Sequence, residues 1–368
     1  MSSLKARIDL SAFRHNLKSV RKIVGPDAAI LPVLKANAYG HSVGPLAREA
    51  LKFGVPMLGL GTLEEGIELR RFEIAAPILL LDGIFKEELE EAIKYRLTPV
   101  VHSMDIARAL NRHGLKIGKK LPMHLKFDTG MSRLGINFGE AAEVIPGIKK
   151  MRHIDVEGIM THFASATERD SPQTDLQIRR FDNILKMARE AGLDPKLTHA
   201  ANSGAIINYP LSHYQMVRPG IMLYGAPPSS VKSISFKPVM TLVSRLISIK
   251  NVTGGEGVGY NATYTTPRTK KIGVVMGGYG DGMNRLLSNR AVVTLRGKYL
   301  PVVGNICMDN FMVDLSRAPA ARVGDEVTLL GGNAVEKTSA GTMAEIAGTI
   351  PYEIFCGIGN RVERIIRS

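Results

Sequence analysis

The feature that most constrains the fold is a repeated pattern of short apolar runs, each followed by turn residues and a stretch with helical character. Eight such runs occupy residues 30–34, 57–60, 78–81, 99–101, 123–127, 156–160, 197–201 and 216–223. They are nearly continuous, as expected of parallel strands covered on both faces. Eight β/α units in about 225 residues predict an α/β fold with a closed (β/α)8 barrel, and an open doubly wound sheet is the alternative.

Helices are predicted between these runs, at residues 43–53, 63–72, 87–94, 106–113, 140–148 and 174–191. A further helix is predicted near the start of the chain. There Asp9 and Ser11 are N-cap candidates ahead of the apolar positions up to Leu17.

The pattern changes at residues 225–230 (GAPPSS), a Pro/Gly/Ser stretch that predicts a linker. Short strand-like runs follow at 240–249, 271–276, 291–295, 300–303, 311–315 and 326–330, with one convincing helix near 339–346. This pattern predicts a mostly-β domain. We therefore expect a barrel over residues 11–231 and a C-terminal β domain over 232–368.

Composition narrows the classes of protein. Of 368 residues, 45% are hydrophobic, and no apolar run approaches the roughly 20 residues that span a bilayer. The first ten residues are too polar to predict a signal peptide, and two cysteines, Cys307 and Cys356, fit a reducing cytoplasm. The net charge of +14 permits nucleic acid, an anionic membrane or anionic small ligands as partners.

The basic run at residues 111–120 is interpreted as a solvated face, so we expect neither a nucleic-acid nor a membrane partner. The nine histidines show no spacing typical of metal ligands, and no metal is expected.

Polar residues follow several of the predicted strands, where a barrel builds its active site. Lys35 comes directly after an apolar run, and a desolvated lysine can bond a carbonyl cofactor. A lysine at the barrel rim that extends into solvent is the alternative. Ser203-Gly204 and Gly220-Ile221 follow the last two runs, where barrels often bind phosphate, although ordinary turns would also explain them. Together these residues suggest pyridoxal 5′-phosphate (PLP) bonded at Lys35.

Five motifs carry a resemblance to a known family. They are residues 33–42 (VLKANAYGHS), 128–135 (DTGMSRLG), 217–221 (VRPGI), 278–282 (GYGDG) and 307–309 (CMD). With them the chain closely resembles the alanine racemases, a family of barrel-type PLP enzymes, from Ile8 to Arg364. The resemblance implies that residues 1 to about 10 join the C-terminal β domain. It also implies a head-to-tail homodimer in which each active site combines one barrel with the partner's β domain.

The resemblance assigns roles to the residues that surround the cofactor. Lys35 would carry PLP and act as acid and base on the D-side of the α-carbon. Tyr39, Ser203, Tyr352 and the amides of Gly220 and Ile221 would hold the phosphate, His162 would support Arg218, and Arg133 would approach the phenolic oxygen. Arg218 would face the pyridine nitrogen. Because a guanidinium is always charged, it should disfavour protonation of that nitrogen and suppress transamination.

The second acid/base group would be Tyr260, supplied by the partner subunit. Met308 would meet the substrate carboxylate through its amide, Asp309 would orient the site, and Tyr279 with Tyr352 would narrow the entrance. Gly259 and Asn261 flank Tyr260 where the family commonly has serine and glycine, which makes the loop geometry and substrate breadth less certain.

In the family, the lysine at the position of Lys126 is often carbamylated. The carbamate is an anion that positions the arginine matching Arg133. We expect that modification here, with an unmodified lysine as the alternative.

The expected reaction is racemisation of L- and D-alanine, which supplies D-alanine for peptidoglycan. A racemase of broader specificity, acting on serine for example, is one alternative. A non-catalytic PLP-binding barrel protein is another, although such proteins typically lack the β domain. A barrel-type decarboxylase is disfavoured because Arg218 occupies the position where that chemistry needs an acid.

Overall fold

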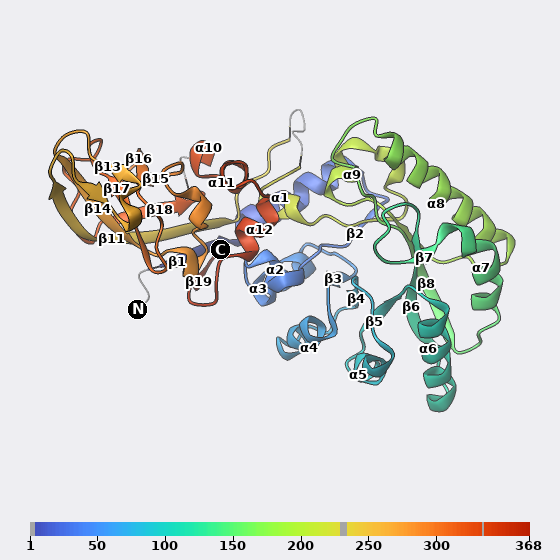
Figure 1. Ribbon diagram of the computed structural model, residues 1–368. Coiled ribbons are helices and arrows are strands. Elements are labelled where there is room, and N and C mark those ends of the chain that lie inside the picture. The colour runs from blue at the N-terminus through green and yellow to red at the C-terminus, as the bar shows by residue number, and fades with distance from the viewer. Residues whose placement is uncertain (1–3, 229–233, 333–334) are drawn as a thin grey trace.

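The structure, a computed structural model, describes residues 4–228, 234–332 and 335–368. Two domains lie end to end (Figure 1), a barrel built from the N-terminal two-thirds of the chain and a β-rich domain built mainly from the last third.

Eight parallel strands form the barrel. They are β2 (Ala29–Ile30), β3 (Leu58–Leu60), β4 (Ile78–Leu80), β5 (Thr98–Val101), β6 (Leu121–Asp128), β8 (Ile154–Met160), β9 (Leu197–His199) and β10 (Met216–Val217). Ladders join β3 to β9 in that order and β10 to β2, and the short β7 (Ile136–Asn137) pairs with β6. Backbone hydrogen bonds complete the ring, from Gly59 to Pro32 (3.0 Å) and from Gln215 to Thr198 (3.2 Å). The predicted closed barrel is confirmed.

The helices cover the barrel's outer face (Figure 1). They are α1 (Leu10–Val24), α3 (Val43–Lys52), α4 (Leu63–Arg71), α5 (Leu89–Lys94), α6 (Met104–Ile117), α7 (Ala141–Lys149), α8 (Pro172–Glu190) and the short α9 (Ser203–Asn208). Asp9 caps α1 by accepting a hydrogen bond from the amide of Ala12 (2.9 Å). All residues of β3, β4 and β5 are buried. This double-sided burial explains why the strands appear in the sequence as continuous apolar runs.

The prediction of a strand over residues 216–223 was wrong beyond Val217, where β10 ends. Pro219 has no amide hydrogen to give to a ladder. The apolar residues Ile221–Tyr224 form a 3-10 helix, η4, and are all buried. Their hydrophobicity therefore reflects packing into the core and not a strand.

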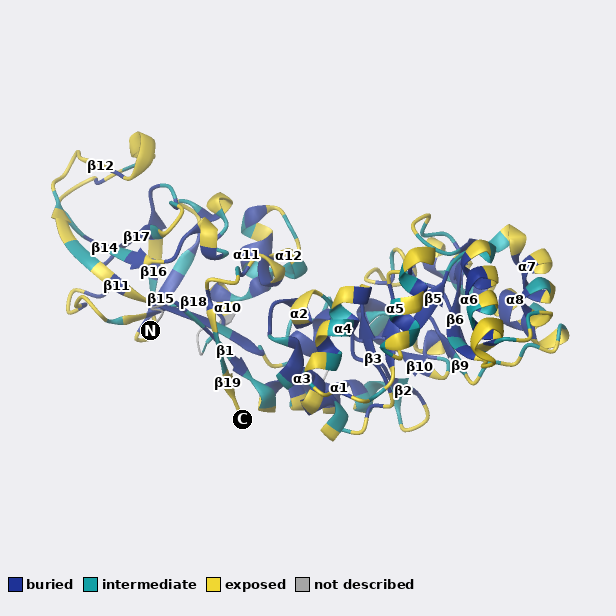
Figure 2. Ribbon diagram, turned by 90° about the horizontal axis from the view of Figure 1, so that it is seen from below, coloured by how far each residue is buried: buried dark blue, intermediate teal, exposed yellow. Residues whose placement is uncertain are grey.

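The second domain is a sheet in the order β14-β17-β16-β15-β18-β11-β1-β19, with β14 also paired to β11. Its strands are β11 (Met240–Val252), β14 (Lys270–Met276), β15 (Val292–Leu295), β16 (Lys298–Val303), β17 (Asn310–Asp314), β18 (Glu326–Leu330) and β19 (Glu363–Arg367). The first strand of the chain, β1 (Lys5–Asp9), lies between β11 and β19. A small hairpin of β12 (Gly257–Val258) and β13 (Tyr264–Thr265) projects from the end farthest from the barrel (Figure 2).

The expectation of a single convincing helix in this domain was wrong. Three helices are present among the described residues, α10 (Val335–Thr338), α11 (Ala340–Ala347) and α12 (Pro351–Cys356). The last has only six residues, too few to display a helical period in the sequence. It matters because it packs against the barrel segment that carries Lys35 and brings Tyr352 to that segment.

The predicted boundary between residues 231 and 232 lies outside the described residues. In the part of the chain that the structure describes, no helix is both long and apolar enough to cross a membrane.

Candidate active site

A cavity of about 460 Å³ lies where the barrel strands end. Side chains that the sequence placed in one site line it together. They are Lys35, Tyr39, Lys126, Arg133, His162, Ser203, Arg218, Gly220 and Tyr352. Eight come from segments that follow or end barrel strands, and Tyr352 comes from α12. Ile221 follows Gly220 but is not among the lining residues.

Lys35 begins a short segment, α2 (Lys35–Tyr39), whose backbone turns the opposite way from an ordinary helix. Ala36, Asn37, Ala38 and Tyr39 have φ angles of 52°, 52°, 55° and 51°. A left-handed conformation costs roughly 1–2 kcal/mol per non-glycine residue, so the segment needs support. Glu65 accepts from the Ala36 amide (2.6 Å), and the Asn37 side chain accepts from the Val43 amide (2.7 Å). The turn directs both Lys35 and Tyr39 into the cavity.

Hydroxyl groups and a backbone amide converge at one end of the cavity. The Gly220 amide donates to the Ser203 hydroxyl (2.9 Å), and the rings of Tyr39 and Tyr352 lie 5.6 Å apart. A Cβ at Gly220 would lie 2.8 Å from the Tyr39 hydroxyl, so only glycine permits this close approach. Such a set of donors suits a phosphate group.

Arg218 is 3% exposed and makes hydrogen bonds with both terminal nitrogens. It donates to the carbonyls of Thr161 (2.7 Å) and Ala200 (2.8 Å) and to ring nitrogens of His199 (2.8 Å) and His162 (3.1 Å). None of these partners is a carboxylate. Burial and then Arg133 lower the pKa of Arg218 to about 9, which leaves the guanidinium charged at neutral pH.

The cavity is electropositive. Lys35, Lys126, Arg133 and Arg218 line it, against the single carboxylate of Asp82. Lys126 is buried, and desolvation followed by repulsion from Arg218 and Arg133 lowers its pKa to about 8. An anion with a phosphate, a phenolic oxygen and a carbonyl fits these surroundings, and 460 Å³ is within the usual range of small-molecule sites. The residues present therefore fit PLP.

Apart from Tyr352, the predicted site residues of the β domain do not line this cavity within the described chain. Tyr260, Met308 and Tyr279 are 71%, 53% and 44% exposed, unusual for such side chains. Tyr260 begins the 3-10 turn η5 (Tyr260–Ala262) in the projecting hairpin of Figure 2.

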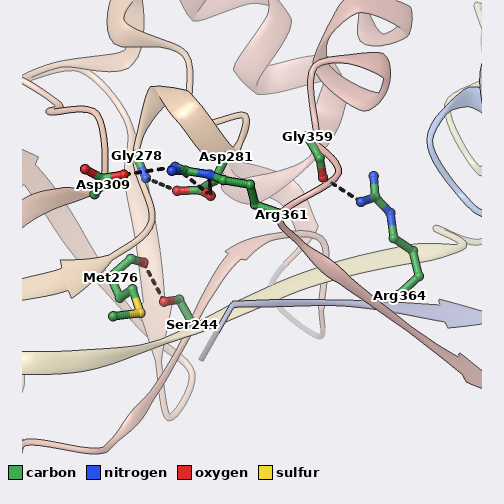
Figure 3. Close-up of polar contacts among 8 residues, drawn as sticks. All are labelled: Ser244, Met276, Gly278, Asp281, Asp309, Gly359, Arg361 and Arg364. Carbon is green, nitrogen blue, oxygen red and sulfur yellow. Dashed lines mark hydrogen bonds and ion pairs between the residues drawn. The ribbon is translucent and has the colours of Figure 1, made fainter. Parts of the chain in front are cut away.

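Asp309 lies on the same domain beside an arginine bridge. Arg361 donates to Asp309 (3.0 Å) and to Asp281 (3.1 Å), and the second oxygen of Asp281 accepts from the Gly278 amide (3.0 Å) (Figure 3). Asp281 ends the turn η6 (Tyr279–Asp281), so one arginine links the turn that carries Tyr279 to the segment that carries Met308 and Asp309.

Sequence reasoning missed four polar residues around the cavity. Asp82 lies 3.2 Å from the Lys35 amine, and Glu65 supports the segment after Lys35. His124 and His199 lie behind Arg218. Each histidine lies within a run that was predicted as a barrel strand, and Asp82 directly follows the run 78–81, which are signals that could have identified them.

Comparisons with known proteins agree with this geometry. A family model described as the alanine racemase N-terminal domain matches residues 8–228, and the C-terminal domain of the same family matches residues 239–366. An alanine racemase of Halothermothrix orenii is 41% identical over 98% of this chain and 95% of its own. That of Geobacter sulfurreducens is also 41% identical, over 98% and 96%.

Solved structures show the same similarity. An alanine racemase of Clostridium difficile 630 superposes with a TM-score of 0.93 at 36% identity, covering 100% of this chain and 96% of its own. One from Bartonella henselae, described with covalently bound pyridoxal phosphate, has a TM-score of 0.91 at 27% identity, covering 100% of both chains.

Fold, cavity and comparisons together define a PLP-dependent isomerase that acts on amino acids. The chain belongs to the alanine racemase family, as its sequence motifs predicted.

Proposed function

We propose that this chain interconverts L- and D-alanine by a two-base mechanism with Lys35 and Tyr260, and that the D-alanine enters peptidoglycan. The observation that carries the proposal is the cavity that gathers Lys35, Arg218, the hydroxyl groups and the Gly220 amide at the strand ends. Family membership supports this reaction, and the cavity contains the residues proposed to hold PLP together with one of the two acid/base groups, Lys35.

Bound PLP would supply a carbonyl group that can bond an amine, and it would withdraw electrons from the substrate α-carbon. Lys35 removes or returns the α-proton on the D-side. Tyr260 does so on the opposite face, because inversion of one carbon requires acid/base groups on both sides. Each such group contributes roughly 10²–10⁴-fold to the rate.

Arg218 keeps the reaction confined to inversion. Its terminal nitrogens are held by carbonyl oxygens and ring nitrogens, and a guanidinium only donates hydrogen bonds. Arg218 would face the pyridine nitrogen of PLP and disfavour its protonation. PLP would then withdraw electrons less strongly, which would favour return of the proton to the α-carbon and suppress transamination.

The active site is completed by a second subunit. The side chains of Tyr260, Met308 and Tyr279 are exposed, and with Asp309 they lie on a part of the β domain that does not line the cavity of their own chain. A head-to-tail homodimer would place them over the partner's cavity and cover their apolar surface. In this arrangement residues 11–231 form the barrel and residues 232–368, with residues 1–10, form the β domain. We place the dimer in the cytoplasm, where the free Cys307 and Cys356 would stay reduced.

Lys126 is carbamylated in this proposal. The buried amine has a lowered pKa and lies near two arginines, so a neutral amine is available to react with carbon dioxide. The resulting anion would attract Arg133 and hold it toward the phenolic oxygen of PLP. High-resolution density that ends at the Lys126 amine would contradict this.

Chiral chromatography of the purified enzyme with PLP and L-alanine tests the proposed function. We expect L-alanine to reach an equal mixture of enantiomers, whereas unchanged L-alanine would contradict the proposal. An amino-acid panel tests the broader alternative, because Gly259 and Asn261 flank Tyr260 where the family commonly has serine and glycine. Asn261 has a φ of 62°, a conformation that asparagine adopts more readily than most residues, so glycine is not needed there. Comparable turnover of serine would support that alternative.

A further inference from the structure

A chain of three buried side chains runs through the barrel interior to the cavity. His124 comes from β6, His199 from β9, and Arg218 from the segment after β10. The Nδ1 atom of His124 lies 2.7 Å from Nε2 of His199, and Nδ1 of His199 lies 2.8 Å from Nη1 of Arg218. Both rings are completely buried. Only the last member of the chain lines the cavity.

The hydrogen bond from Arg218 determines which nitrogen of each of the two histidines carries a proton. A guanidinium has no acceptor, so Nδ1 of His199 must carry a lone pair and accept from it. A neutral His199 then carries its proton on Nε2, and this N–H donates a hydrogen bond to Nδ1 of His124. His124 must in turn hold its own proton on Nε2. One tautomer of each ring satisfies both contacts.

The charges agree with this arrangement. Burial, and secondly Arg218, lowers the pKa of His124 to about 3, and the same causes hold the pKa of His199 well below its usual range. Both rings are therefore neutral at physiological pH. Of these three side chains, only Arg218 is positively charged, and it lines the cavity.

Packing fixes His124 in place. Gly158 of β8 lies directly opposite it in the ladder, and a Cβ there would be 2.4 Å from Nδ1 of His124. The rings of His124 and His199 lie edge to face, with their centroids 5.0 Å apart. The Nε2 atom of His124 has no hydrogen-bond partner among the described residues. An unpaired buried donor is unfavourable, so an apolar side chain would serve a purely structural role better.

We propose that His124 is a positioning residue for Arg218: by accepting a hydrogen bond from Nε2–H of His199, it fixes the tautomer of His199 that holds the guanidinium in the cavity. The inference deepens the proposed function and rests on it for the role of Arg218. Without an acceptor at position 124, His199 keeps an unsatisfied Nε2–H. Its ring can then reorient and release Nη1 of Arg218.

The tautomers can be read directly by ¹⁵N NMR of PLP-loaded enzyme labelled at histidine. We expect a pyridine-type resonance for Nδ1 and a pyrrole-type resonance for Nε2 in both residues. The resonances that disappear in His124→Gln and His199→Asn identify the two rings. A protonated Nδ1 or an imidazolium at either position would overturn the proposal. This measurement needs no activity, so its outcome is separate from that of the proposed function.

A matched pair of variants tests the effect on Arg218. In His124→Gln an amide oxygen can still accept from His199, whereas His124→Met has similar volume and no such acceptor. The readout is pyruvate released by transamination per alanine inverted. We expect the ratio to rise roughly tenfold in His124→Met, equivalent to about 1.4 kcal/mol, and less than about twofold in His124→Gln. Equal ratios in the two variants would overturn the proposal. If His124→Met does not fold, the wild-type NMR spectrum decides.

Discussion

The barrel cavity and the exposed face of the β domain differ in how their functional residues are held. In the barrel, Arg218 and Ser203 are buried and hydrogen-bonded at strand ends, and the left-handed segment after Lys35 is braced by Glu65. In the β domain, Tyr260 and Tyr279 lie on short 3-10 turns with much of each side chain exposed. The half that holds the cofactor is thus complete within one chain. The half that we propose to carry the second base, Tyr260, is an exposed surface.

The difference suggests a division of labour. Rigid strand ends suit a cofactor whose atoms must be fixed, since catalytic geometry depends on locked side chains. In the proposed dimer, the base on the projecting hairpin reaches the substrate bound by the other subunit. If this account holds, changes in the barrel should affect cofactor binding. Changes in the β domain should affect proton transfer and leave the cofactor bound.

The largest effect is expected for Lys35→Ala, which removes both the covalent attachment of PLP and one acid/base group. Racemisation should fall by about 10⁴-fold or more, because such a group alone contributes roughly 10²–10⁴-fold. Borohydride reduction followed by mass spectrometry should find no PLP adduct. Lys52→Ala, which alters an exposed lysine of α3, serves as the control and should retain both. A reducible adduct in Lys35→Ala would place the attachment elsewhere.

Tyr260→Phe should lower L-to-D conversion by roughly 10²–10⁴-fold, the usual worth of an acid/base group, while PLP absorbance stays intact. Tyr264→Phe, in the same hairpin, should change activity little. Full activity in Tyr260→Phe would end the two-base assignment and with it the role given to the hairpin.

Carbamylation of Lys126 should depend on pH. The free amine is required, and the pKa of about 8 means that protonation removes it as the pH falls through that value. A ¹³C carbamate resonance should appear in enzyme equilibrated with ¹³C-bicarbonate at pH 9 and fade at pH 6. It should be absent in Lys126→Ala, and activity should fall roughly tenfold in that variant, as expected for the loss of a charge-assisted contact. A resonance that persists in Lys126→Ala would assign it to another amine.

Gly220→Ala tests the phosphate end of the cavity. The added Cβ would approach the Tyr39 hydroxyl at 2.8 Å and displace a group that lines the site. The dissociation constant for PLP, from titration of the apoenzyme, should rise by about tenfold, the equivalent of about 1.4 kcal/mol. Gly341→Ala in α11 has room for a methyl group and should bind PLP normally. Unchanged affinity in Gly220→Ala would remove Gly220 from the phosphate site.

The smallest effect is expected for Arg361→Lys. Lysine keeps the charge but cannot bridge Asp281 and Asp309 as a planar guanidinium does. The KM for alanine should rise roughly threefold with little change in kcat, as for the loss of one modest hydrogen bond. Arg285→Lys, at an exposed position of the same domain, is the control. A large loss of PLP binding in Arg361→Lys would contradict the separation of the two halves.

The sequence predicted the barrel well because its strands are buried on both faces and therefore stand out as apolar runs. It also located the residues that follow those strands, such as Lys35 and Arg218. It failed where an apolar run has another cause, as in η4, and where an element is short, as in α12. Partners of the site residues were harder to predict. The contact between His124 and His199 joins residues 75 positions apart and arises only when the barrel closes.

The division between the two domains can be tested most directly by mixing chains that carry Lys35→Ala with chains that carry Tyr260→Phe. If each site combines one barrel with the partner's β domain, every mixed dimer has one site with both changes and one with neither. Random mixing of equal amounts should then restore about a quarter of wild-type racemase activity, because half of the two-fold symmetric dimers are mixed. Activity no greater than that of the two separate variants would show that each chain uses its own Tyr260, and would contradict the account.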